Sequence, residues 1–401
     1  MVRSGSGRVL PVIVLAQLAG TSLWFAGNAV LPELLRAAHL SATAQGAAVS
    51  AVQLGFIAGT LLVGLLRLAD RLPPTRLFLL SAALGSLANA ALLLPGPGLE
   101  RVLLLRCATG LCLAGIYPVG MKIAADHFER GLGLALGWLV GALVLGTALP
   151  HLLRLLATGQ AWPAVVLGTS ALALAGGLLL WALVPDGPYR RPAVRLAASA
   201  AWGVLRAVPF RQAVLGYFGH MWELYTFWAF VPLLLATHAR LHPGLPAYAP
   251  GWAFGIIAAG APACVLGGYL ARRWGSLPTA RRALAVSGCC CLLSPWLLLL
   301  PKPFFVAVVV LWGMAVIADS PQFSTLVAQR APATAIGTAL TLATCLGFAT
   351  TVLSLQLFAA AQAWVLARWL FGLLALGPLL GLWATRARPG AAVAGGPRNF
   401  A

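Results

Sequence analysis

The sequence predicts an all-α membrane protein with twelve transmembrane helices in two pseudo-symmetric six-helix bundles, and three observations lead to this fold class. Of the 401 residues, 61% are hydrophobic and only 9% are charged, whereas a water-soluble domain carries roughly 25% charged residues. Apolar stretches close to the roughly 20 residues that a membrane-spanning helix needs recur from Leu10 to Thr385. Short segments in the two halves of the chain also match each other, which indicates a duplicated unit.

The twelve predicted spans are apolar stretches separated by short polar segments. They cover residues 10–31, 45–68, 76–95, 102–124, 131–153, 163–184, 211–236, 251–271, 283–300, 303–325, 335–358 and 364–385. The longest polar interruption, Pro185–Gln212, divides them into two sets of six. We therefore expect an N-terminal six-helix bundle over 1–184, a central cytoplasmic loop over 185–210, a C-terminal six-helix bundle over 211–385 and a cytoplasmic tail over 386–401.

Matching segments in the two halves support this duplication. The segment GIYPVGMKIAADHF, which contains Pro118, aligns with ADSPQFSTLVAQR, which contains Pro321. Pro32 at the end of the first span corresponds to Pro232 in the seventh, again at a separation of roughly 200 residues. Transporters built from such repeats bind their substrate between the two halves.

The positive charges predict the orientation in the membrane, because Lys and Arg stay on the cytoplasmic side. With a cytoplasmic amino terminus, most of the 27 Lys and Arg residues fall in inward segments. The outward loops then hold only Arg36, Arg101, Arg154, Arg240, Lys302 and Arg368. We therefore expect a multi-pass protein of the plasma membrane, the inner membrane of a bacterium, with both termini cytoplasmic. The net charge of +19 reflects this pattern, and no nucleic-acid partner is expected.

Polar and aromatic residues in the spans of the first half are candidates for lining the substrate path. Trp24 and Asn28 are four residues apart in the first span and share one helix face. The second span adds Gln53, and the fourth adds Tyr117. Trp24 and Asn28 are the strongest candidates for substrate contact, and interhelical hydrogen bonds are the alternative role.

The seventh span carries an ionisable pair, in the segment GHMWELYTFW. Glu223 lies 12 residues after Arg211, so it is roughly 18 Å into the membrane and close to its midplane. His220 lies three residues earlier and shares its face of the helix. A charged group at this depth costs about 2.5–3.5 kcal/mol on insertion scales. The pair is interpreted either as a proton-coupling site or as a structural contact with a neighbouring helix. Trp228 on the same helix, like Trp24, is deep enough to stack a planar substrate.

The tenth span holds the second intramembrane carboxylate, Asp319, in the segment ADSPQFS. Pro321 lacks a backbone N–H, so it predicts a kink in this helix. With Gln322 the segment forms a polar patch. Two roles for Asp319 stay open: contact with substrate or a gate, and an ion pair with an arginine at the cytoplasmic end.

Small residues in the spans are assigned packing roles. Gly137, Gly141 and Gly146 in the fifth span predict close helix contacts. The seven cysteines lie in apolar stretches and are expected to be free, since nothing in their spacing resembles a disulfide framework or a zinc site.

Twelve spans, the six-plus-six repeat and the basic central loop resemble the major facilitator superfamily over nearly the whole chain. The loop GLLRLADRLPPTR is similar to a family signature, which Asp70, Arg71 and Arg76 match. Leu66 and Pro73 stand where that signature has glycines. In the family this loop acts as a gating latch, so the resemblance implies that Asp70 pairs with an arginine of another helix in one gating state.

The segment RCATGLCLAG is similar to a second pattern of the family, in the fourth span. Arg106 and Gly110 match it. The resemblance implies a role in proton coupling for Arg106. On charge alone, Arg106 favours an anionic substrate and Glu223 a cationic or planar one, and the two residues could instead compensate each other.

The resemblance implies a secondary active transporter that moves a small organic solute by alternating access, with protons as the expected coupling ion and a symporter or exporter cycle. The alternatives are proton-driven efflux of hydrophobic or aromatic compounds, a copper-type metal importer, and a non-transporting membrane sensor. We expect no enzyme and no cofactor, because the sequence has no nucleophile–base constellation, no metal-ligand cluster and no phosphate-binding loop of an ATP-driven pump. A monomer in the lipid bilayer is expected.

Overall fold

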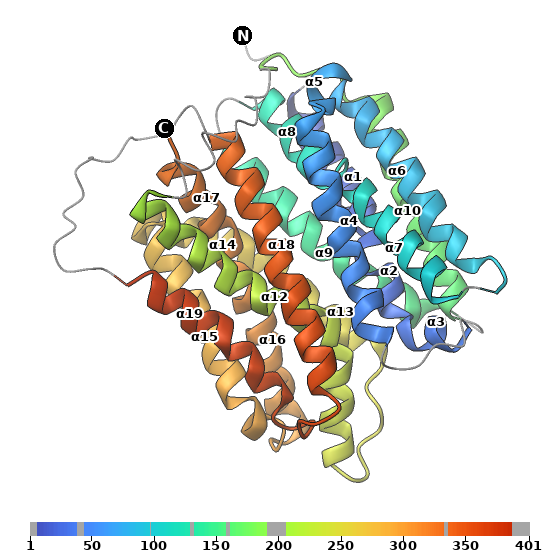
Figure 1. Ribbon diagram of the computed structural model, residues 1–401, viewed down its shortest axis with the longest axis vertical. Coiled ribbons are helices and arrows are strands. Elements are labelled where there is room, and N and C mark those ends of the chain that lie inside the picture. The colour runs from blue at the N-terminus through green and yellow to red at the C-terminus, as the bar shows by residue number, and fades with distance from the viewer. Residues whose placement is uncertain are drawn as a thin grey trace.

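The computed structural model describes residues 6–37, 44–96, 98–128, 132–157, 161–190, 206–332 and 336–386, and those ranges are helical with no strand. Figure 1 shows the helices running side by side along the long axis of the molecule. Most of the predicted central loop (residues 191–205) and nearly all of the predicted tail (residues 387–401) lie outside the described residues.

The helices follow the predicted spans closely. The first half contains α1 (Ser6–Thr21), α2 (Leu23–Ala29), α3 (Leu31–Ala37), α4 (Ala44–Leu65), α5 (Leu68–Arg71), α6 (Pro74–Ala90), η1 (Ala91–Leu93), α7 (Leu99–Leu113), α8 (Tyr117–His127), α9 (Leu132–Leu156) and α10 (Ala161–Leu183). The second half contains α12 (Val208–Leu241), α13 (Pro250–Ala258), α14 (Gly260–Trp274), α15 (Ser276–Leu297), α16 (Lys302–Ala318), α17 (Ser320–Arg330), α18 (Ile336–Ala361), η3 (Leu370–Ala375) and α19 (Leu376–Ala384).

Nine helical segments of the described chain are long and apolar enough to cross a membrane. The predicted spans 211–236, 283–300 and 364–385 correspond to α12, α15 and the η3–α19 segment, which are not among the nine. The η3–α19 segment, Leu370–Ala384, is apolar but shorter, while α12 and α15 carry charged side chains that lower their hydropathy. The number twelve therefore stays a prediction for these three segments.

The fourth span of the first half and the equivalent span of the second half are each interrupted at an equivalent position. Leu99–His127 and Lys302–Arg330 each have 29 residues. The second breaks at Asp319, between α16 and α17, where Pro321 stands in the first turn of α17. Proline removes a hydrogen-bond donor and clashes with the preceding turn, so the predicted kink is confirmed. The first breaks between α7 and α8 before Pro118. The predicted span 102–124 is confirmed, since Leu99–His127 is one of the apolar segments long enough to cross a membrane, and the break within it was not predicted.

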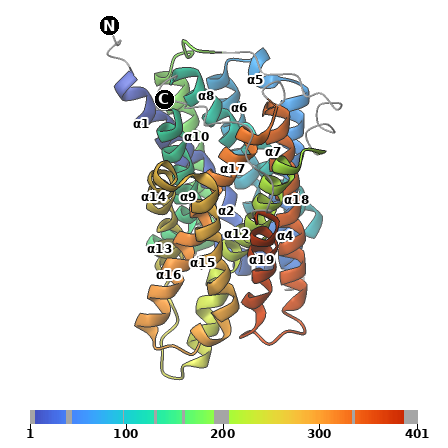
Figure 2. The same cartoon turned by 90° about the vertical axis from the view of Figure 1, so that its left-hand side faces the viewer.

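The helices of each half pack mainly among themselves, for example α4 on α7 and α12 on α19. Contacts between the halves join α4 to α18, and α9 to α13 and α14. We call the end of the molecule that carries α5 the α5 end; α5 lies at the top in both views (Figures 1 and 2). In Figure 1, α3 lies toward the opposite end of the first half, and we call that end the α3 end.

The two halves touch near the start of α4, close to the α3 end. The amide nitrogen of Gln356 on α18 donates a hydrogen bond of 3.1 Å to Ser50 Oγ on α4. A methyl group on Gly46 of α4 would lie 2.8 Å from the side chain of Ala359 on α18. These contacts hold α4 and α18 directly against each other at this end.

Glycines set several of the closest helix contacts. A Cβ on Gly146 would lie 2.1 Å from Thr21 Oγ1 of α1, so the predicted packing role of Gly146 is confirmed. Gly141 faces Ala261 of α14 at an ordinary contact distance of 3.7 Å. The same prediction is wrong for Gly137, where an added Cβ would meet nothing within 4 Å. The seven cysteines are free thiols.

Candidate functional site

Glu223 on α12 is buried inside the second half, where three donors hold its carboxylate. Trp312 Nε1 on α16 donates at 2.7 Å to Oε1, and Ser287 Oγ on α15 donates at 2.8 Å to Oε2. The thiol of Cys291 lies 3.2 Å from Oε1. The carboxylate thus ties α12 to α15 and α16. Sequence reasoning missed these three partners, because none of them is near Glu223 in the chain.

Replacing Glu223 tests how much this contact contributes to stability. Glu223→Leu leaves the Trp312 indole N–H buried without its acceptor, and an unsatisfied buried donor costs about 1–3 kcal/mol. Ser287 loses its bond to the carboxylate but can still donate to the Leu284 carbonyl at 3.2 Å. We expect a clear fall in the thermal midpoint for Glu223→Leu and a smaller fall for Glu223→Gln, whose amide oxygen still accepts from one donor. Thermal unfolding of the purified protein in detergent measures both, and equal midpoints for the two variants would contradict the role of these donors.

His220 and Asp319 form a buried ion pair between α12 and the break between α16 and α17. His220 Nδ1 lies 2.7 Å from Asp319 Oδ1, and both side chains are 1% exposed. Apart from this ion pair, the ring nitrogens of His220 and the carboxylate oxygens of Asp319 have no well-aligned hydrogen bond to a described residue. The rings of Tyr217 and Phe323 flank the histidine, with centroids 6.0 and 6.4 Å away.

This pairing corrects two sequence-based interpretations. His220 was grouped with Glu223 as neighbours on one helix, but the structure gives each its own partners on other helices. The alternative in which Asp319 pairs with an arginine at a helix end is also wrong for this arrangement, since the described ion-pair partner of Asp319 is His220.

Arg106 on α7 is buried in the first half, and its described hydrogen-bond partners are neutral. Its Nε donates at 2.6 Å to the carbonyl oxygen of Ala48 on α4, and its Nη2 donates to Asn28 Oδ1 on α2. No carboxylate in the described part of the chain lies within ion-pair distance of it. A Cβ on Gly27 would collide with the guanidinium, so that glycine makes room for it. Arg106 and Glu223 therefore do not compensate each other directly.

Aromatic rings from both halves meet in what we call the ring cluster. It consists of Trp24, Phe25, Phe56, Tyr117, Tyr225, Trp228 and Phe348. Trp24 of the first half stacks on Tyr225 and Phe348 of the second, with centroids 5.6 and 5.5 Å apart. Gln53 Oε1 accepts a hydrogen bond of 2.9 Å from Trp24 Nε1.

The structure thus brings together Trp24, Gln53, Tyr117 and Trp228, four of the residues that the sequence singled out. Sequence reasoning missed Phe25, Phe56, Tyr225 and Phe348, although Tyr225 lies within the same segment as Glu223. Gln322 is buried on α17, and its backbone N–H donates to the Asp319 carbonyl. It therefore belongs to the helix break rather than to the ring cluster.

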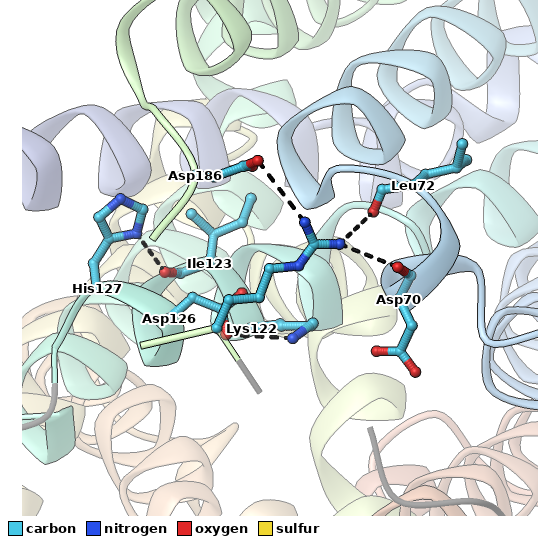
Figure 3. A network of polar contacts seen from close by, with 8 residues as sticks. Asp70, Leu72, Lys122, Ile123, Asp126, His127 and Asp186 are labelled. Atoms are coloured by element: carbon cyan, nitrogen blue, oxygen red, sulfur yellow. Dashed lines mark hydrogen bonds and ion pairs between the residues drawn. The ribbon is translucent and has the colours of Figure 1, made fainter. Parts of the chain in front are cut away.

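The predicted gating loop lies at the α5 end in a network of polar contacts (Figure 3). The carboxylate of Asp70 pairs with Arg67, three residues earlier, at 3.1 Å. The guanidinium of Arg190, which follows α10, donates to the backbone carbonyls of Asp70 and Leu72 at 3.2 and 3.1 Å. The guanidinium of Arg190 thus binds the backbone of the loop. The ion pair of Asp70 with an arginine of another helix in one gating state stays a prediction.

The other two signature residues are exposed, and a residue beside the signature has a strained backbone. Arg71 and Arg76 are exposed. Arg67 adopts a left-handed backbone conformation with φ of 52°, a conformation that glycine favours. It directly follows Leu66, which stands where the family signature has a glycine.

Arg190→Ala is expected to weaken the attachment of this loop by about 1 kcal/mol, because two charge-assisted hydrogen bonds to the loop are lost at a largely exposed site. The exposed ion pair of Arg190 with Asp186 at 3.8 Å is lost as well and adds little. The measurement is the thermal midpoint together with limited proteolysis at the α5 end. Arg76→Ala is the matched control at an exposed arginine. A proteolysis rate that is the same for both variants would show that Arg190 does not hold the loop.

Comparison with known proteins identifies the family to which the chain belongs. The model of the Major Facilitator Superfamily matches residues 13–355. Among solved structures, the fold is similar to a point mutant of the nucleoside transporter NupG, with a TM-score of 0.72, 12% identity, and coverage of 94% of this chain and 98% of that chain.

A second similar structure is the xylose transporter XylE from E. coli in a partially occluded inward open conformation. The TM-score is 0.72 and the identity 14%, with 96% of this chain and 100% of that chain covered. The comparison with curated protein sequences returns no match. At these identities the structural likeness concerns the fold, while the family match extends over most of the sequence. The chain is a member of the Major Facilitator Superfamily.

Proposed function

We propose that this transporter moves a small organic solute between its two halves by alternating access and that the movement is coupled to protons through His220 and Asp319. The ring cluster is the proposed solute site, since it is built from helices of both halves. The proposal includes the predicted orientation with both termini cytoplasmic, the division into bundles over 1–184 and 211–385, and a monomer in a plasma membrane.

The observation that carries the proton coupling is the buried His220–Asp319 pair at the break between α16 and α17. Binding one proton changes the net charge of the pair by one. A net charge is costly in a buried, low-dielectric site and cheap in a water-filled one. The protonation state of the pair therefore biases the protein between a closed arrangement and one that admits water, which is the linkage that a proton-coupled cycle needs.

Glu223 is the second candidate for the coupling proton. Its three donors stabilise the ionised carboxylate and bind it to the interior of the second half. A proton on Glu223 would weaken the contacts with α15 and α16, so its protonation could also shift the packing of α12. Asp319 is preferred because its partner is itself titratable and because it lies at a helix break.

Transport in liposomes tests the proposal. The purified protein is reconstituted with a pH-sensitive dye inside, and a panel of acidic, basic and neutral solutes is added outside. We expect internal pH to change with at least one solute, in a direction that distinguishes symport from exchange. A panel without any solute-dependent proton movement would overturn the coupling. Export of hydrophobic or aromatic compounds is the alternative cycle, favoured by the aromatic character of the ring cluster.

A further inference from the structure

We infer that the solute is a small planar aromatic acid, bound as its anion, with its ring in the ring cluster and its anionic group toward Arg106. This inference rests on the proposed function, because it names the solute class for the same path. Three features of the site carry it: a ring stack divided between the halves, a buried donor without a partner, and a buried positive charge whose described partners are neutral.

The ring stack is divided between the halves. Trp24 faces Tyr225 and Phe348 at interplanar angles of 29° and 24°. Trp24 belongs to the first half and its two partners to the second, so movement of the halves in the proposed cycle separates these rings. A planar ring of the solute can take the place of the lost partner, since stacked rings at such distances attract each other. A saturated ring has no flat aromatic face that could stack on these rings.

The buried donor is the indole nitrogen of Trp228. Its ring is fully buried and packs at steep angles against Phe25 and Tyr225 in the ring cluster, with centroids 6.1 and 5.5 Å away. Nε1 has no hydrogen-bond partner among the described residues. A buried N–H without an acceptor is rare and unfavourable. A solute that carries an acceptor on or beside its ring would satisfy it.

The buried positive charge is Arg106. Its neighbour Asn28 lies one helical turn after Trp24 on α2 and on the same face, so along that helix the partner of the guanidinium is about 6 Å from the position of Trp24. A buried guanidinium that has only a carbonyl and an amide oxygen as partners lacks a counter-charge. The carboxylates of the second half are held elsewhere, Glu223 by its three donors and Asp319 by His220. An anionic solute supplies the missing charge, through the paired hydrogen bonds that arginine makes to a carboxylate.

Matched probes separate the ring from the charge. Benzoate and 2-naphthoate carry both features, cyclohexanecarboxylate carries the charge without the planar ring, and benzamide and 2-naphthamide carry the ring without the charge. Binding to the full-length protein in detergent is followed by calorimetry and by the quenching of tryptophan fluorescence. We expect at least one aromatic acid to bind about tenfold more tightly than its own amide and than cyclohexanecarboxylate.

Variants then assign the residues. Arg106→Gln is expected to weaken binding of the acid at least tenfold and to leave the weak binding of the amide unchanged, while Arg106→Lys, which keeps the charge, retains part of the affinity. Trp228→Phe keeps the ring and removes the N–H, and a severalfold loss is expected. Arg101→Gln, at an arginine whose described hydrogen bonds are to exposed backbone carbonyls, is the control and should bind as the unchanged protein does.

The outcomes distinguish this inference from the proposed function. If amides or the saturated acid bind as tightly as the aromatic acids, or if Arg106→Lys and Arg106→Gln both bind them with full affinity, the inference is overturned. If none of the acids binds but another solute moves protons in liposomes, the inference fails and the proposed function stands. If an acid binds in an Arg106-dependent way but drives no proton movement, the solute class stands and the proton coupling fails.

Discussion

Asp319→Asn is expected to reduce the initial rate of proton-coupled transport by roughly 100-fold, the lower end of what a positioned proton-transfer group contributes to a catalysed reaction. The amide is nearly isosteric with the carboxyl group, so the break between α16 and α17 and the packing around it should persist. What is lost is the ability of the His220–Asp319 pair to take up a proton on the carboxylate. The measurement is the rate of solute-driven pH change in liposomes.

Exchange of labelled for unlabelled solute without a pH gradient is the internal control. It requires solute binding and movement of the halves but no net proton transfer, so Asp319→Asn should retain it. Asp186→Asn makes the same chemical change at a half-exposed carboxylate at the α5 end and should keep the full coupled rate. His220→Gln should resemble Asp319→Asn. A full coupled rate in Asp319→Asn would move the coupling proton to Glu223.

Asp319 and Glu223 show which features of the site are predictable from the sequence and which are not. Helical rise placed both residues within the membrane, and Pro321 predicted the break that the structure confirms at Asp319. The partners were not predictable from spacing. Three residues rotate an α-helix by about 300°, so His220 and Glu223 differ by about 60° in direction. On a helix that packs against several others, this difference is enough to point them at different neighbours.

The break before Pro118 was within reach of the sequence. Pro118 and Pro321 were matched as equivalent positions of the repeat, and a kink was predicted at only one of them. Applying the repeat consistently would have predicted both breaks. The ring cluster was only partly predictable for a different reason. Trp24 and Trp228 stand out as large rings deep in their spans, but the pairing of Trp24 with Phe348 depends on how the two halves meet, and no local pattern encodes that.

We expect the largest loss of stability from adding a single methyl group at the contact between α4 and α7. A single methyl group on Gly55 would lie 1.9 Å from the carbonyl oxygen of Cys107, and one on Gly110 would lie 2.0 Å from that of Val52. Both obstacles are backbone atoms, which cannot rotate away as a side chain can. The two helices must therefore separate, which weakens the van der Waals packing that helps to hold helices together in lipid.

Gly55→Ala and Gly110→Ala are each expected to destabilise the protein by about 3 kcal/mol, the upper part of the usual range for overpacking. The effect opposes the helix propensity of alanine, which by itself favours the substitution by roughly 0.5–1 kcal/mol. Gly137→Ala isolates that propensity, because its added methyl group meets nothing within 4 Å. It should leave the thermal midpoint unchanged or raise it.

The double variant Gly55→Ala, Gly110→Ala sharpens the test. Both methyl groups force apart the same pair of helices, so a separation that accommodates one partly accommodates the other, and the combined loss should be smaller than the sum of the two single losses. Thermal unfolding and the fraction of monodisperse protein in detergent measure all four variants. Midpoints for Gly55→Ala and Gly110→Ala that match that of Gly137→Ala would mean that α4 and α7 do not depend on these glycines for their contact.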